Sequence, residues 1–336
     1  YLAAQPFLRT FGPNMDSAQL FNILMLAVLI WTTYVLGRSI WRVGVGLFSA
    51  LLIGLLPMIA AMARLFYTEL ALTVAVTFSL TALLRSDGFR ARSWSISLGV
   101  CLGLGMLIKW ALPIYLLLPI LWTLSREGSL FKPLFQWREW RIDTRALLIA
   151  VAAGLIFVAI WSWPNRSEFD QFLLGNLLHL GWFIIVGLWT YLIFQSASPT
   201  SNFLLALSSA ALVASFWYLP HIDFVSDVLV QDRVRGGREA PFLNPYSYYR
   251  DLLVLYATHL GSLASWLMLP IGLFPWLRAL WSRKPISAHS SLLWTCLLST
   301  YLILALLSQD SPRFLVPILP AFVILLVVGL WQYGAV

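Results

Sequence analysis

Long apolar runs recur along the whole 336-residue chain. Runs of 18 or more such residues are long enough to cross the ~30 Å hydrocarbon core of a bilayer. Only 11% of the residues are charged and 60% are hydrophobic, whereas soluble domains carry about 25% charged residues. A soluble fold would need a core with almost no surface. The sequence therefore predicts an all-α, polytopic transmembrane helix bundle.

We predict ten to eleven membrane segments within a single transmembrane domain that spans residues 1–336. In chain order they are Ala18–Leu36, Val43–Met62, Thr68–Leu84, Ser95–Leu107, Pro113–Leu124, Ala146–Trp163, Leu178–Gln195, Phe203–Leu219, Leu252–Trp276, Ser291–Leu307 and Phe314–Trp331. The fourth and fifth are short, and one interpretation is a hairpin that does not fully cross. A small-xxx-small pair, Gly99 and Gly103, favours close helix packing there.

The distribution of positive charge predicts an orientation. If the loop after the first segment is cytoplasmic, that side carries thirteen of the 22 Lys and Arg residues and the other side carries nine. Cytoplasmic loops of membrane proteins are enriched in Lys and Arg. The acidic residues divide four to ten in the opposite sense. Orientation thus accounts for the net charge of +8, and we expect no nucleic-acid partner.

This orientation places several polar groups on the extracytoplasmic face. The stretch "RLFYTE" contributes Arg64, Tyr67 and Glu69, the tip of a turn contributes Lys109, and "SPRF" contributes Arg313. A carboxylate one turn into a membrane segment costs a few kcal/mol unless it is paired or hydrated. Guanidinium and ammonium groups at an outer interface suit a lipid phosphate.

Three of these residues also have a structural explanation that the sequence leaves open. Glu69 can lie in headgroup water or pair with Arg64. Lys109 can snorkel to the interface beside Trp110. Arg313 can pair locally with Asp310.

An outer loop at residues 220–251 is the longest polar stretch predicted on this face. Loops of this length are often binding loops, although a plain solvated loop is the alternative. Its candidate substrate-binding residues combine charges with tyrosines: Asp223, Arg233, Arg235, Arg238, Tyr248 and Tyr249.

Metal and disulfide chemistry find little support in the sequence. Cys101 and Cys296 fall inside apolar segments and are interpreted as small buried hydrophobic residues. The four histidines have no metal-ligand spacing. We therefore predict no metal site and no obvious cofactor, and metal dependence stays open.

Three stretches carry a resemblance to a known family: "GLFSALLIGLLPMIAAMARLFYTELALT", then "LGLGMLIKW", then "SPRFLVPILPAF". In this order they resemble the GT-C glycosyltransferases, and are most similar to the bacterial relatives of the dolichyl-phosphate-mannose-protein mannosyltransferases. The resemblance runs along nearly the whole chain. It implies a GT-C-like bundle in the bacterial inner membrane with its active face outward.

The resemblance also implies an activity: transfer of a sugar from a polyprenyl-phosphate carrier to a glycan, lipid or protein acceptor. The family's acidic catalytic residue lies in a first outer loop, which would precede Tyr1. We therefore interpret the chain as a piece without the first helix and that loop. None of the fourteen acidic residues matches the motif, and Glu69 is the weak candidate.

Two other function classes are alternatives. A transporter or flippase of a lipid-linked or anionic substrate would show charges near the bilayer centre and an internal repeat, and neither is evident. The alternative of an O-antigen-type polymerase or ligase would be supported by the arginine-rich loop alone.

Overall fold

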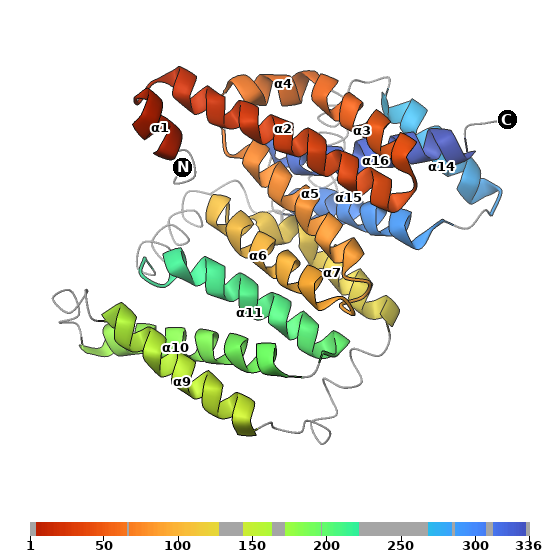
Figure 1. Ribbon diagram of the computed structural model, residues 1–336. Coiled ribbons are helices and arrows are strands. Elements are labelled where there is room, and N and C mark those ends of the chain that lie inside the picture. The colour runs from red at the N-terminus through yellow and green to blue at the C-terminus, as the bar shows by residue number, and fades with distance from the viewer. Residues whose placement is uncertain are drawn as a thin grey trace, which may run out of the picture. The chain divides into compact units, whose positions relative to one another are not determined.

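The computed structural model describes residues 5–65, 67–127, 144–162, 172–195, 197–221, 268–283, 286–306 and 312–333. All regular elements in these ranges are helices (Figure 1), so the all-α prediction is confirmed. They are α1 Gln5–Phe11, α2 Met15–Ile40, α3 Val43–Leu55, α4 Pro57–Arg64, α5 Glu69–Arg85, α6 Arg92–Ile108, α7 Leu112–Glu127, α9 Thr144–Ser162, α10 Phe172–Phe194, α11 Pro199–Tyr218, α14 Met268–Trp281, α15 Ala288–Leu306, the 3₁₀ helix η4 Pro312–Ile318 and α16 Leu319–Tyr333.

Ten of the eleven predicted membrane segments coincide, to within a residue or two, with one or two of these helices. The ninth, Leu252–Trp276, ends in α14, and its residues 252–267 lie outside the described residues. Three of the described helices, α2, α11 and the run Arg313–Gln332, are long and apolar enough to span a bilayer, and α3 with α4 makes a fourth if the pair counts as one span. Shorter apolar helices include α6, α7 and α15. The chain is thus a helical membrane protein.

The chain divides into two compact units, which we describe separately. The first comprises Tyr1–Arg85, Ile108–Thr123 and Pro241–Val336, and the second comprises Ser86–Leu107 and Leu124–Ala240. Our expectation of a single transmembrane domain stays a prediction.

The start of α2 differs from what the sequence predicts. The stretch "MDSAQ" before an apolar run predicts Asp16 as the helix cap, and the structure shows this prediction to be wrong. Asn14 is the N-cap of α2, and its Oδ1 accepts hydrogen bonds from Ser17 N at 2.8 Å and Ser17 Oγ at 2.7 Å. Asp16 lies in the first helical turn instead. Asparagine and aspartate are about equally good caps, so the residue types alone do not distinguish Asn14 from Asp16.

The predicted second segment is not one straight helix. α3 ends at Leu55 and α4 starts at Pro57, with a bend of 59° between them. Leu56 is extended at φ −63° and ψ 123°, because proline disfavours helical geometry in the residue before it. The bend redirects α4, which carries Arg64 at its C-terminal end.

The core of the first unit is built around α16. Its residues from Leu319 through Val328 are almost all apolar and buried, as expected of a helix that is hydrophobic on every side. α16 packs against α3, α14 and α15, while η4 packs against α5. The packing of η4 against α5 brings Arg313 toward the start of α5.

The second unit is held by close helix packing. A Cβ built on Gly99 of α6 would overlap the carbonyl oxygen of Ala206 in α11 and lie 2.7 Å from Ser209 Cβ. At Gly103 it would lie 2.5 Å from Val213 Cβ. The small-residue prediction is confirmed, but these glycines contact α11, so they do not argue for a hairpin of α6 with α7.

The two cysteines are free thiols in helices of different units. Cys296 in α15 is completely buried, and its Sγ lies 3.4 Å from the carbonyl oxygen of Tyr115. Cys101 in α6 is partly exposed. Cys296 therefore fits the buried hydrophobic role, and Cys101 fits it in part.

Candidate functional site

A buried carboxylate in the first unit is shared by two cations. The Nζ atom of Lys109 lies 3.1 Å from Oε1 of Glu69, and the Nε atom of Arg313 lies 3.7 Å from the same oxygen. We call these three residues the Glu69 cluster. They come from the start of α5, the turn before α7 and the start of η4.

Exposure within the Glu69 cluster is graded. The side chain of Glu69 is 4% exposed, that of Lys109 is 20% exposed and that of Arg313 is 46% exposed. The acid thus lies at the bottom, and the cations lie between it and the surface. A buried carboxylate without cations would carry a large desolvation cost, so the pairing explains how Glu69 is tolerated at the end of an apolar helix.

Aromatic groups fix the two cations. Lys109 Nζ lies 4.4 Å from the ring centroid of Phe314, and Arg313 Cζ lies 5.5 Å from it, both within cation–π range. The backbone of Phe314 is held in turn, because the buried Tyr115 donates its hydroxyl to the Phe314 carbonyl at 2.9 Å. Tyr115 of α7 therefore positions the segment that carries Arg313.

A buried amide holds the approach to α5. Asn22 in α2 is fully buried, and its Nδ2 donates to the carbonyl oxygens of Met62 at 3.2 Å and Leu65 at 2.5 Å. These carbonyls belong to the C-terminal end of α4 and would otherwise lack helical partners. Asn22 thus anchors the chain just before Tyr67 and Glu69.

The net charge of the Glu69 cluster is +1, since two cations share one carboxylate. Both ion pairs use Oε1, and Oε2 accepts no hydrogen bond from the described residues. Lysine offers three donors and arginine five. The cluster can therefore bind a further anion without losing its internal pairing.

The structure places the predicted site residues in two groups. It brings Glu69, Lys109 and Arg313 together, whereas Arg64 and Tyr67 are exposed and form no hydrogen bond or ion pair with these three residues. Pairing of Glu69 with Arg64 is therefore wrong: the partners of Glu69 are Lys109 and Arg313. Lys109 is likewise held in an ion pair, not merely snorkelling.

Other candidates lie outside the described residues. They are Asp310 and the outer-loop residues Asp223, Arg233, Arg235, Arg238, Tyr248 and Tyr249.

The sequence reasoning missed three residues of this region. Asn22 was visible as an amide inside an apolar segment, which demands a hydrogen-bond partner. Tyr115 and Phe314 gave no signal, because aromatic residues are common throughout the segments. Within the described ranges, no group of three or more His, Cys, Asp and Glu residues could hold a metal ion.

Comparison with known proteins gives one family match. Residues 2–163 match the family described as dolichyl-phosphate-mannose-protein mannosyltransferase. This range includes two members of the Glu69 cluster, Glu69 and Lys109. A search of curated proteins finds no match.

One solved structure is similar to the chain: the crystal structure of ArnT from Cupriavidus metallidurans in the apo state, at 15% sequence identity and a TM-score of 0.26. The alignment covers 97% of this chain and 65% of the ArnT chain, so the chain spans about two thirds of the length of ArnT. The family match is therefore the informative comparison: over residues 2–163, just under half of its length, the chain is similar to the dolichyl-phosphate-mannose-protein mannosyltransferase family.

Proposed function

We propose that the protein transfers a sugar from a polyprenyl-phosphate carrier to an acceptor on the extracytoplasmic side of the membrane. The observation that carries this proposal is the Glu69 cluster, in which Lys109 and Arg313 share one buried carboxylate and retain a net positive charge. The family match over residues 2–163 supports the reaction class.

The cluster suits the phosphate of a lipid-linked sugar. Breaking the bond between the sugar C1 and the phosphate oxygen leaves a polyprenyl phosphate, whose negative charge grows as the bond breaks. Fixed cations stabilise such a charge most when they are already oriented, since they need not reorganise during the reaction. Phe314 and Glu69 hold Lys109 and Arg313 in this way.

Glu69 has a different role in this proposal. Its Oε1 is occupied by the two cations, and Oε2 is left to accept a hydrogen bond from a sugar or acceptor hydroxyl. Glu69 thereby orients one substrate against the phosphate site. Assigning it as the general base would require it to give up its ion pairs, so the catalytic base stays unassigned within residues 1–336.

Two groups at the edge of the site complete the proposal. Arg64 and Tyr67 are exposed, and we place them at the mouth through which the lipid-linked sugar enters. The loop at residues 220–251, with its arginines and tyrosines, closes over sugar or acceptor and excludes water. The acceptor is a glycan, a lipid or a protein, and the setting is the bacterial inner membrane.

The test replaces Lys109 with methionine, which keeps the length of the side chain and removes its charge. Arg313 still pairs with Glu69, so we expect the variant to fold, which gel filtration and chemical unfolding check. We expect sugar transfer from polyprenyl-phosphate donors to fall by about 100-fold, equivalent to the loss of one hydrogen bond to a charged group of ~2.7 kcal/mol.

The matched control is Arg278→Gln, which removes an exposed positive charge at the end of α14. We expect this variant of the complete protein to transfer sugar at the wild-type rate in the same membranes. Full activity of folded Lys109→Met would contradict the phosphate-binding role of Lys109. If the complete wild-type protein transfers no sugar from these donors, the transferase proposal itself is wrong.

A further inference from the structure

We propose that an apolar groove between α3 and α16 binds one acyl chain of an anionic glycerophospholipid, with the lipid phosphate against Arg42. This site lies in the first unit and shares no residue with the Glu69 cluster. It does not depend on the proposed transferase activity.

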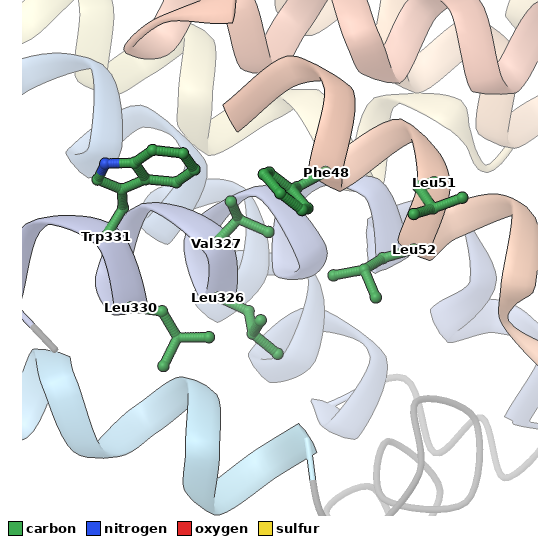
Figure 2. Close-up of a pocket in the computed structure, with 7 residues that line it drawn as sticks. All are labelled: Phe48, Leu51, Leu52, Leu326, Val327, Leu330 and Trp331. Atoms are coloured by element: carbon green, nitrogen blue, oxygen red, sulfur yellow. The ribbon is translucent and has the colours of Figure 1, made fainter. Parts of the chain in front are cut away.

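The groove has a buried floor and exposed walls, all of them apolar (Figure 2). Leu326 and Val327 of α16 form the floor at 6% exposure each, and Phe48 and Leu51 of α3 are more than half exposed. Leu52, Leu330 and Trp331 complete the lining. The cavity volume is about 490 Å³, within the ~300–1,000 Å³ typical of small-molecule sites.

A positive charge lies at one end of this groove. The guanidinium of Arg42, the residue that precedes α3, lies 4.1 Å from the ring centroid of Trp331. Arg42 is exposed and has no acidic partner in the described part of the chain. A fixed cation stacked on an aromatic wall is thus free to accept an anion.

A glycine lies against the ring on which Arg42 stacks. A Cβ added to Gly44 would lie 3.0 Å from Cη2 of Trp331, so even alanine there would require the indole ring to shift by a few tenths of an ångström. Tryptophan is also the side chain preferred at the level of lipid headgroups. Arg42 and Trp331 therefore mark the headgroup end of the site. Leu51 lies farther along the groove, where the acyl chain would lie.

These features favour a phospholipid over other occupants. The lining offers an acyl chain apolar contacts, and the exposed Arg42 offers its phosphate a charge. Our orientation places Arg42 at the cytoplasmic surface, where anionic lipids are abundant. Lys109 is predicted on the opposite face, so this lipid is distinct from the lipid-linked sugar.

The experiment is native mass spectrometry of the complete protein in a neutral detergent, with equal amounts of phosphatidylglycerol and phosphatidylcholine that carry identical acyl chains. We expect the first bound lipid to be phosphatidylglycerol, with a preference of about fivefold, the effect of one basic residue near an anionic headgroup. Arg42→Gln should abolish this preference, while Arg278→Gln should keep it.

A second variant tests the groove itself. Leu51→Trp places a larger side chain on an exposed wall, so it should fold normally, which gel filtration checks. We expect it to lower the binding of both lipids. Equal lipid preference in Arg42→Gln and Arg278→Gln would overturn the proposal, and so would a protein dimer that dissociates in Leu51→Trp, because the groove would then receive a second copy.

Discussion

Cationic side chains have different partners in the two units of the molecule. In the second unit, Arg92 at the start of α6 donates hydrogen bonds to the carbonyl oxygens of Leu192, Ile193 and Gln195 at the end of α10. In the first unit, Lys109 and Arg313 pair with the side chain of Glu69. Both regions pair cationic side chains with oxygen atoms, but among the described residues only the first unit uses a buried carboxylate to do so.

The difference distinguishes Arg92, whose charge has a structural role, from Lys109 and Arg313, whose presence stability alone does not explain. Arg92 satisfies carbonyls that a helix end leaves unpaired and complements the negative end of the helix dipole, so stability alone explains it. A buried ion pair is often no more stable than apolar residues of the same volume. The Glu69 cluster therefore adds little stability that apolar packing would not supply, and anion binding is the reason we assign to it.

The largest expected effect lies in the second unit. Gly99→Ala would drive a Cβ into the backbone carbonyl of Ala206, and we expect a loss of about 3 kcal/mol in the free energy of unfolding, at the upper end for overpacking. Chemical unfolding in detergent measures it. Gly181→Ala is the control, because its added Cβ would lie 3.6 Å from the side chain of Leu219, an ordinary contact. If the two variants are equally stable, close packing of α6 on α11 is wrong.

An intermediate effect is expected at the edge of the Glu69 cluster. Arg313→Gln removes a half-exposed cation that lies 3.7 Å from Glu69. We expect KM for the lipid-linked sugar to rise about tenfold, equivalent to ~1.4 kcal/mol, while the free energy of unfolding changes little. Steady-state kinetics against donor concentration measures the change. A large loss of stability with unchanged KM would make Arg313 a structural residue like Arg92.

The smallest effect is expected at Arg64. This residue is exposed at the end of α4 and has no acidic partner among the described residues, so water and salt screen its charge. Arg64→Gln should lower kcat/KM for the donor by about twofold at low salt and have no effect at high salt. If Arg64→Gln impairs donor use as strongly as Arg313→Gln does, this expectation is wrong and Arg64 acts together with the Glu69 cluster.

Much of the fold could be predicted from hydropathy alone. Where the structure describes them, the predicted membrane segments lie on helices, because a bilayer-length apolar run leaves the backbone few other options. The break at Leu56 follows from Pro57 and could have been predicted. The choice of Asn14 over Asp16 as the cap could not, since both side chains can accept the same hydrogen bond.

The candidate site could be predicted only in part. Topology placed Glu69, Lys109 and Arg313 on one face, but it said nothing about which cation pairs with the acid. That choice depends on the packing of η4 against α5 and on Tyr115, which holds the Phe314 carbonyl. Contacts between residues some 200 positions apart leave no pattern in a single sequence.

The most direct test of the central claim is the affinity of the complete protein for a polyprenyl phosphate, the product of the proposed reaction. We would measure its dissociation constant in nanodiscs for the wild type, Lys109→Met and the control Arg278→Gln. The Glu69 cluster predicts binding about 100-fold weaker in Lys109→Met and unchanged in Arg278→Gln. Equal affinity in all three proteins would contradict the claim that this cluster binds the carrier phosphate.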